Sequence, residues 1–584
     1  MSEPATPLPS EPATQLPSEP ATQLPSEPLT PLPSEPATPL PSEPAPPLPS
    51  EPVTQLPSEP LAPLPGTPAE AEAEADRTSP RPQRGDELEL RIESLAFGGE
   101  GVARLGDGRY VVFVAGAIPG DLVRAVVHKR KRSYAHARTL EVLEPGPERI
   151  APVADHPGVP WQVIPYERQL EIKAEQVGEA LRRIGHLDGF EMEEIVPAVE
   201  RWRYRNKLEY SFGTSSEDGG LVCGFHASAG GNQVTPMGDC MLASERGNRA
   251  REIALAWCRE QGLTAWDRGR ARERPGDGDG DGGERAAGTD SPGERAAGTM
   301  GAQGARREHS ERTGPGPDGR ARLRNLVIRE GRRTGKLQVR IVTTEGELEA
   351  GPLAQALSRE LGDGLTGVLW TRLRRLAETT SGGETELVWG ESELGERLGE
   401  LDLRISPEAF FQTNTEMAER LYAIAVSYAA LEGWERVYDL YSGIGTIALT
   451  LAPHAGEVWG IELVEQAVAD AIAGAERNEI TNAKFFAGDT RLALPELLER
   501  VVRPDVVVVD PPRAGLSAKV VRRIIEASPK RIVYISCNPT TLAPNADELT
   551  QAGWTLKKVR PVDMFPQTHH IECVALLERD VSSR

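Results

Sequence analysis

The chain has 584 residues, a formal net charge of −22 and five cysteines. Single hydrophobic cores rarely grow beyond about 250–300 residues, so at least two domains are expected. The five cysteines contain no CxxC pair, which excludes a disulfide framework and fits a reducing cytoplasm. Without an apolar run of about 18 residues or a secretory leader, we expect a cytoplasmic protein with no membrane contact, and nothing implies a stable protein partner.

A repeat occupies the N-terminal part of the chain. The unit SEPxxxLP recurs eight times from Ser2 to Pro65. Its prolines fix φ and remove backbone donors, so we expect residues 1–83 to be a disordered tail rich in polyproline II conformation; a solenoid would have too little apolar surface to bury. Eleven glutamates and Asp76 against two arginines give this tail a net charge of −10, out of −22 for the whole chain. The overall charge therefore does not exclude an anionic partner.

Residues 84–144 are predicted to form a small β-barrel. The expected strands are Glu87–Ile92, Gly101–Leu105, Arg109–Val114, Asp121–His128 and His136–Leu143. Five strands in about sixty residues are typical of an OB-like barrel. Four consecutive cations follow the fourth strand: Lys129, Arg130, Lys131 and Arg132. With Tyr134 close by, they predict a rim that binds nucleic acid; a solvated charge run is the alternative.

Residues 145–405 are expected to form a central domain. A helix is predicted over Arg249–Gln261 and a strand over Leu337–Thr343. Between them, residues 268–320 are rich in Gly, Asp and Arg and contain the sequence GERAAGT twice. This composition indicates a disordered insertion within a folded domain.

Residues 406–584 alternate β-rich runs with helical patterns. The predicted strands are Val437–Tyr441, Glu457–Ile461, Lys484–Phe486, Asp505–Val509 and Arg531–Ile535. Helices are predicted over Glu465–Arg477 and Ala518–Ala527. Strands that alternate with helices indicate a doubly wound, mostly parallel sheet, so the chain as a whole is expected to be a multidomain α/β protein.

A glycine-containing loop follows the first of these strands, in the sequence Asp439-Leu-Tyr-Ser-Gly-Ile-Gly-Thr446. Glycines at this edge of a sheet let the backbone approach a ligand, and Glu462, at the end of the next strand, can accept hydrogen bonds from ribose hydroxyls. Asp489 follows the third strand and could hold an adenine amino group. The loop lacks the third glycine of the dinucleotide fingerprint, which favours S-adenosylmethionine over a dinucleotide.

Two further loops lie at the same predicted edge. Asp510-Pro-Pro-Arg513 follows an apolar strand, and Asp510 is either a ligand-facing acceptor or a turn cap. Amino-group methyltransferases carry a related motif with an aromatic residue where this chain has Arg513. The next strand ends in Ser536-Cys537-Asn538-Pro539. A cysteine on an apolar strand is commonly a small buried hydrophobe, but at a strand end before a helix it is a candidate nucleophile.

A thiolate at this edge suits methylation of a pyrimidine carbon. Addition of sulfur to C6 of uracil turns C5 into a nucleophile, and the adduct then needs a base to remove the C5 proton. Glu572, which enters an apolar strand near the C-terminus, is the candidate base, because a carboxylate is costly there unless it is used or paired. His569 and His570 are alternative bases.

Five motifs resemble the RNA (uracil-5-)-methyltransferase family. They are Phe410-Phe-Gln-Thr-Asn414, Asp439-Leu-Tyr-Ser-Gly-Ile-Gly445, Asp510-Pro-Pro-Arg513, Ser536-Cys-Asn-Pro539 and Thr568-His-His-Ile-Glu572. The resemblance implies that Cys537 is the nucleophile and Glu572 the base. It also implies the following contacts to the cofactor or active site: Gln412, Tyr441, Thr446 (often Asn in the family), Glu462 and Asp510.

The resemblance extends to the RNA. Residues 84–144 look like the family's TRAM domain, and Phe410 matches an aromatic residue near the target base. Arg203, Arg205 and Lys207 resemble a basic element of the central domain that suits single-stranded RNA. By family analogy the RNA is 23S rRNA, with tRNA as the alternative.

The chain departs from many relatives in one region. They hold a [4Fe–4S] cluster through four cysteines, whereas residues 155–170 contain none and only Cys240 stands where the fourth ligand would be. We therefore predict no iron–sulfur cluster and no metal site. Rival functions are cytosine-5 methylation, disfavoured because Pro512 stands where those enzymes place a cysteine, amino-group methylation, and RNA binding or folding without catalysis.

Overall fold

The computed structural model describes residues 81–106, 110–226, 233–266, 316, 318–374, 379–500 and 503–579. All of them belong to one compact unit, Ser79–Arg584. The predicted tail and the predicted insertion lie almost entirely outside the described residues. Among the helices that are described, none is long and apolar enough to cross a membrane.

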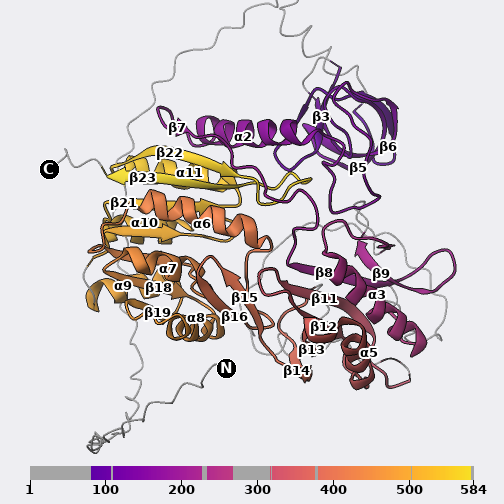
Figure 1. Cartoon of the computed structure of the whole chain (residues 1–584). Helices are drawn as coiled ribbons and strands as arrows, with labels where there is room; N and C mark the ends of the chain where they lie inside the picture. The colour runs from indigo at the N-terminus through magenta and orange to yellow at the C-terminus, as the bar shows by residue number, and fades with distance from the viewer. Residues whose placement is uncertain are drawn as a thin grey trace, which may run out of the picture. The chain divides into compact units, whose positions relative to one another are not determined.

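The first part is a six-stranded sheet wrapped around its own small core (Figure 1). Its strands are β1 (Glu87–Arg91), β2 (Ser94–Leu95), β3 (Gly101–Leu105), β4 (Tyr110–Ala115), β5 (Leu122–Arg130) and β6 (Tyr134–Glu144), in the order β1-β5-β6-β4-β3-β2. Inward residues alternate with outward ones, as in Val112 and Val114, which are fully buried. The predicted OB-like barrel is confirmed; the two-residue β2 was not predicted, because it is too short to show alternation.

The second part is a seven-stranded sheet in the order β10-β9-β8-β11-β12-β13-β14. Its strands are β8 (Lys207–Thr214), β9 (Leu221–His226), β10 (Val234–Pro236), β11 (Leu323–Gly331), β12 (Lys336–Thr343), β13 (Leu365–Arg372) and β14 (Glu384–Gly390). The helices α3 (Glu245–Glu260) and α5 (Gly351–Leu361), the latter followed by η1 (Gly362–Gly364), pack on its core. A separate hairpin, β15 (Leu394–Leu398) and β16 (Leu401–Ile405), follows in the chain.

The third part is an eight-stranded sheet in the order β19-β18-β17-β20-β21-β23-β22-β7. Its strands are β17 (Arg436–Leu440), β18 (Glu457–Glu462), β19 (Ala483–Ala487), β20 (Val506–Val509), β21 (Arg531–Ser536), β22 (Trp554–Val562), β23 (Glu572–Arg579) and β7 (Glu191–Met192). The first five strands in this order are mutually parallel, and β23 runs antiparallel to both of its neighbours. The predicted doubly wound sheet is confirmed.

Helices cover both faces of this sheet (Figure 1). One face packs against α6 (Thr415–Ala429), α7 (Thr446–Leu451), η2 (Ala452–His454) and α8 (Glu465–Arg477). The other packs against α2 (Tyr166–Arg183), α9 (Thr490–Arg500), α10 (Ala518–Ala527) and α11 (Pro539–Gln551). The all-valine strand β20 sends Val506 and Val508 to one face and Val507 and Val509 to the other, which is why it reads as a continuous apolar run.

One part of the domain division differs from the sequence expectation. Residues 145–405 were expected to form one central domain, but α2 and β7, from within that range, join the third part. β7 pairs with β22 at the edge of the eight-stranded sheet, and α2 packs against α11. A helix that packs on a sheet far along the chain leaves no local sign of its partner in the sequence.

Candidate active site

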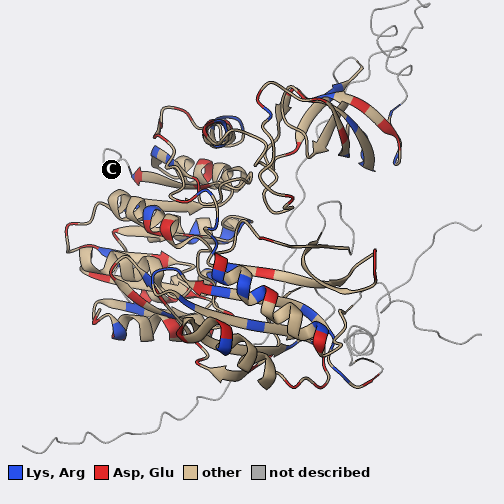
Figure 2. Cartoon of the chain, turned by 45° about the vertical axis from the view of Figure 1, so that its right-hand side comes forward, with Lys and Arg blue, Asp and Glu red and all other residues tan. Residues whose placement is uncertain are grey.

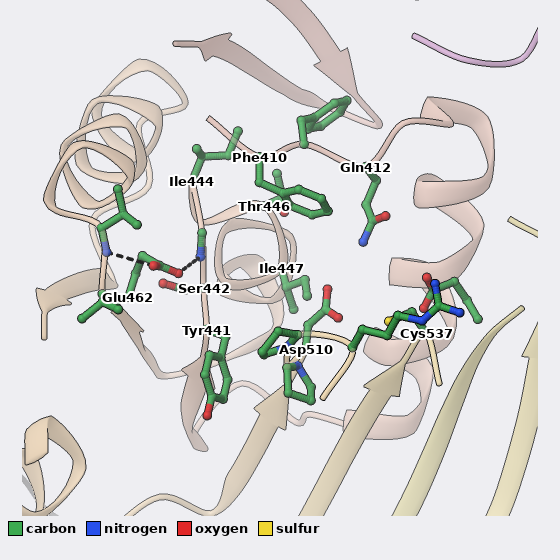
Figure 3. Close-up of a pocket in the computed structure, with 18 of the residues that line it drawn as sticks. Phe410, Gln412, Tyr441, Ser442, Ile444, Thr446, Ile447, Glu462, Asp510 and Cys537 are labelled. Carbon is green, nitrogen blue, oxygen red and sulfur yellow. Dashed lines mark hydrogen bonds between the residues drawn. The ribbon is translucent and has the colours of Figure 1, made fainter. Parts of the chain in front are cut away.

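A pocket of about 940 Å³ opens where the parallel strands end. It is lined by residues that follow β17, β18, β19, β20 and β21, together with residues 410–413 and 570–572 from two other segments. Figure 3 shows Glu462 and Cys537 on opposite sides of this pocket, with Asp510 between them. Carboxyl ends of parallel strands share one sheet edge, so motifs about 100 residues apart in the sequence converge on one cavity.

The glycine loop at one end of the pocket is fixed by Glu462. The Glu462 carboxylate accepts hydrogen bonds from the backbone N–H of Gly443 (3.0 Å) and of Val464 (2.9 Å). A carboxylate has about four acceptor positions, so two remain for a ligand's hydroxyl groups. A Cβ on Gly445, where φ is +80°, would lie 2.9 Å from Ala471, so only glycine allows this packing.

Tyr441 and Thr446 flank this loop. The predicted first strand ended at Tyr441, but β17 ends one residue earlier and Tyr441 turns with φ of +68° so that it lines the pocket. Thr446 begins α7 and also lines the pocket, and its hydroxyl donates to the Tyr422 hydroxyl at 3.2 Å. Tyr422, on α6, was not among the predicted site residues because nothing in a helical pattern marks which face meets a ligand.

Asp489 lines the pocket but already has a partner. Its carboxylate pairs with the Arg491 guanidinium, whose Nε lies 2.9 Å away, and this hydrogen bond holds the pKa of Asp489 at about 2. An adenine amino group would therefore share this acceptor with Arg491. Beside it, Leu463 and Val464 line the pocket while 67% and 55% exposed, which suits a flat heterocycle. The sequence showed these two apolar residues directly after Glu462, but not that they are exposed.

Gln412 and Asp510 lie in the middle of the pocket (Figure 3). Burial raises the pKa of Asp510 to about 7, and a hydrogen bond from Gln412 opposes this shift. Gln412 is held in place through its backbone carbonyl, which accepts a hydrogen bond from the Asn206 side chain at 2.8 Å. Asn414 caps α6 and donates to the Met564 carbonyl at 3.0 Å. The Phe410–Asn414 motif thus ties this pocket wall to two distant segments.

Cys537 lies directly after β21, in a loop that is joined to the Asp510 loop. Asn538 caps α11 and its side-chain amide donates to the Arg513 carbonyl at 3.1 Å. Thr541 donates to the same carbonyl at 3.4 Å. Of the five cysteines, Cys537 is the one that is not buried, and it lines the pocket. The interpretation of Cys537 as a small core residue is therefore wrong.

The surroundings of Cys537 favour the protonated form of its thiol. Partial burial raises the pKa of Cys537 to about 11, and the nearby Glu572 and Asp510 carboxyl groups add to the shift, while Arg513 opposes it. Glu572 begins β23, is 4% exposed, and has a pKa raised well above its ordinary value by burial and by Asp510. Three acidic groups thus face one arginine, so protonation of one group depends on the others.

The two histidines are less suited to act as the base. Burial lowers the pKa of His569 to about 4 and that of His570 to about 3. An effective general base has a pKa near the working pH, so both imidazoles are weak proton acceptors at neutral pH. His570 lines the pocket, whereas His569 packs against Gly99 of the barrel, where a Cβ would come within 2.8 Å of the His569 side chain.

Of the residues predicted to contact RNA, some line the pocket and others do not. Phe410 is 69% exposed where it lines the pocket, and Arg205 also lines it, 5.6 Å from the Phe565 ring. Arg203 and Lys207 do not line the pocket; they form ion pairs of 2.6 Å with Asp239 and Glu209. In contrast, the barrel cations Lys129, Arg130, Lys131 and Arg132 are all exposed.

Cys240 lies in the central part, away from the pocket. Its sulfur is 3.1 Å from Nε2 of His156, and both side chains are buried. Burial lowers the pKa of His156 to about 4. Within the described ranges, no three His, Cys, Asp or Glu side chains are grouped as metal ligands.

Comparison with known proteins shows which family this chain resembles. Residues 391–580 match the model for tRNA (Uracil-5-)-methyltransferase, and residues 81–140 match the TRAM domain. An uncharacterized RNA methyltransferase of Halalkalibacterium halodurans is 32% identical over 510 residues, which cover 85% of this chain and 97% of the relative. Another, of Gloeobacter violaceus, is 35% identical over 505 residues, or 85% and 97% of the two chains.

A solved structure shares the fold. The tRNA (uracil-54, C5)-methyltransferase of Pyrococcus abyssi, in complex with S-adenosyl-L-homocysteine, superposes with a TM-score of 0.60 at 24% identity and covers 84% of this chain and all of that one. The RNA methyltransferases that match this chain over most of their length establish the type of enzyme. The chain is a methyltransferase and belongs to the RNA (uracil-5-)-methyltransferase family.

Proposed function

We propose that this enzyme methylates C5 of a uridine in RNA, with Cys537 as the nucleophile and Glu572 as the base. The observation that carries the proposal is which residues line the pocket. Cys537, the one cysteine that is not buried, and the buried carboxyl group of Glu572 line it together with a loop held by Glu462 that suits a ribose. An amino-group methyltransferase would need Asp510 alone and would leave Cys537 and Glu572 without a role.

The cofactor end of the pocket fits S-adenosylmethionine, which supplies the methyl group that C5 accepts. Glu462 keeps acceptor positions for the ribose hydroxyls, and the side chains of Leu463 and Val464 offer apolar contact to the adenine. Tyr441, Thr446 and Asp489 complete the wall on this side, and Gln412 contributes from the middle of the pocket.

The other end fits the uracil ring. The Cys537 thiol passes its proton to the Asp510 carboxylate as its sulfur bonds to C6. This addition makes C5 nucleophilic and leaves Glu572 free to act as the base. After methylation, Glu572 removes the proton from C5, and the electron pair left behind expels the sulfur from C6. The raised pKa of Glu572 makes it a stronger base than an ordinary glutamate. The exposed Phe410 ring and Arg205 line the path by which a flipped-out nucleotide would enter.

The RNA is proposed to be 23S rRNA, with tRNA as the second candidate. The barrel at the N-terminal side of the fold supports the former by family analogy. The latter is supported by the matching family model and the P. abyssi structure, both named for tRNA. Mapping 5-methyluridine in the rRNA and tRNA of cells with and without the gene decides between them. If deletion of the gene removes 5-methyluridine from neither RNA, both proposals are refuted.

The nucleophile is tested by substitution. Cys537→Ala should abolish methylation and leave RNA binding intact, while Cys258→Ala, a buried thiol in the second part of the fold, serves as the matched control and should stay active. Methylation by the Cys537→Ala protein would exclude the covalent mechanism. RNA binding without any methylation by the wild-type protein would favour a non-catalytic binding factor.

A further inference from the structure

Four aromatic rings lie together on the barrel. They come from three neighbouring strands: Phe113 on β4, His128 on β5, and Tyr134 and His136 on β6. The rings of Phe113 and His136 stack with centroids 5.3 Å apart, and Tyr134 meets both edge-on at 5.8 and 5.5 Å. The His128 ring is 6.1 Å from that of His136. We call these four residues the ring cluster.

The ring cluster lies on the outer face of the barrel. Phe113 is flanked in sequence by Val112 and Val114, and His136 by Ala135 and Ala137, and all four neighbours are fully buried. Because side chains alternate along a strand, the rings must point the other way. None of the four belongs to the barrel core, and each keeps some exposure. The rings therefore present apolar faces that the core does not require.

Cations surround these rings. Lys129 pairs in register with His136, and Arg138 projects from β6 two residues further on. Within the described part of the barrel, Lys129, Arg130, Lys131, Arg132 and Arg138 make no ion pair. The three other strand arginines of the barrel all do: Arg91, Arg104 and Arg124 pair with glutamates. Figure 2 shows the charged residues along these strands.

One carboxylate faces the ring cluster. Both oxygens of Glu100 lie 3.2 Å from Nδ1 of His136. This contact positions the imidazole that stacks on Phe113, and among the described residues Glu100 makes no ion pair with the five cations. Although the chain has a net charge of −22, these unpaired cations give this surface a local positive charge that attracts anions.

We propose that the ring cluster is a stacking platform for single-stranded RNA, with the five unpaired cations holding the phosphates on either side. An unpaired nucleotide offers a base face on which an aromatic ring can stack, whereas the bases of a duplex already stack on one another. Cations alone would bind duplex and single strand through the same phosphates. The proposal deepens the proposed function, since it rests on RNA being the substrate and names an unpaired segment as what the barrel binds.

The test is a binding measurement on the full chain that does not depend on methylation. A Cys537→Ala background prevents adduct formation, and the probes are a fluorescein-labelled oligouridine and a perfectly paired RNA hairpin of equal charge. The variants are Phe113→Leu and Tyr134→Leu, with Phe113→Trp as the variant that keeps a stacking ring. Leu140→Ala, at an exposed apolar position of β6 outside the cluster, is the matched control.

Each leucine variant should weaken oligouridine binding by roughly 5- to 150-fold, the range for loss of one stacked base, and change hairpin binding little. Phe113→Trp and Leu140→Ala should bind like the parent. Replacing Lys129 and Lys131 together by Gln should lower the slope of log K against log salt by about 1.4, or about 0.7 for each phosphate that is no longer neutralised. Unchanged oligouridine binding in folded leucine variants, or a hairpin bound as tightly as oligouridine by the parent, would overturn the platform. Either result leaves methylation by the wild-type enzyme untouched.

Discussion

Lys173 and Asp563 form an ion pair of 2.5 Å in which neither side chain is exposed to solvent. Asp563 also accepts a hydrogen bond from the Tyr166 hydroxyl at 2.8 Å, and the Lys173 ammonium donates to the Phe565 carbonyl at 3.1 Å. These contacts join α2 to the segment that leads into the pocket wall and Glu572. Next to them, Gln169 donates to the Gln567 side chain at 2.8 Å. The segment before Glu572 is thus held by a helix almost 400 residues earlier in the chain.

Removing one partner of this pair should be costly. Lys173→Met leaves the Asp563 carboxylate buried without its cation and should lower the free energy of unfolding by about 3–5 kcal/mol. Replacing both, as Lys173→Met with Asp563→Leu, should recover part of the loss because no charge remains buried. Urea unfolding of the single and double variants measures the difference. A single variant as stable as the wild type would show that the pair does not hold α2 in place.

Arg513 should control the reactivity of Cys537. Arg513 is the cation that lowers the pKa of this thiol against the effect of burial and the two carboxyl groups. Arg513→Gln should therefore move the pH midpoint of iodoacetamide alkylation of Cys537 above the value of about 11 expected for the wild type. Glu572→Gln should move it down, because a like charge is removed. Arg522→Gln, at an exposed position of α10, is the control and should leave the midpoint unchanged. If it shifts the midpoint as much as Arg513→Gln does, the effect is not specific to Arg513.

Asp510 should make stability depend on pH. Its pKa is raised from 3.8 to about 7, so between these values the folded protein holds a proton that the unfolded chain has lost. Stability from this group is complete below about pH 4 and is lost as the pH rises to about 7. Relative to the wild type, Asp510→Asn should therefore gain thermal stability across that window and show a constant difference outside it. A difference that stays flat from pH 4 to 7 would contradict the raised pKa.

Glu462 should matter more for cofactor binding than Asp489. Glu462 positions Gly443 and keeps free acceptor sites, whereas the Asp489 carboxylate is already paired with Arg491. Loss of hydrogen bonds to a charged group costs about 1.5–3 kcal/mol, so Glu462→Ala should weaken S-adenosylhomocysteine binding roughly 10- to 150-fold. Asp489→Asn should weaken it less. Titration calorimetry on both variants measures which substitution weakens binding more. A larger loss for Asp489→Asn would indicate that the ribose binds near Asp489 instead.

The sequence predicted the parts that depend on local patterns. The Cys537 strand end, the Asp510 loop and the Glu462 position follow from apolar strands and the residue that ends each one, and the family comparison confirms the fold and enzyme class. The covalent mechanism and the site assignments remain predictions. What the sequence did not show is long-range pairing: the ion pairs that occupy Arg203 and Lys207, and the placement of α2 and β7 on the third sheet. Such contacts depend on residues far apart in the chain and carry no periodic signal.

The central claim is that the Cys537 sulfur bonds to the uracil ring, and RNA transcripts made with 5-fluorouridine test it most directly. Fluorine at C5 cannot leave as a proton, so the methylated adduct should stay attached to the enzyme. After incubation with S-adenosylmethionine, a denaturing gel should show a protein–RNA band, and mass spectrometry should place the nucleotide on Cys537. A wild-type enzyme that methylates ordinary uridine in the same transcript, yet forms no such band or carries the nucleotide on another residue, would contradict the account.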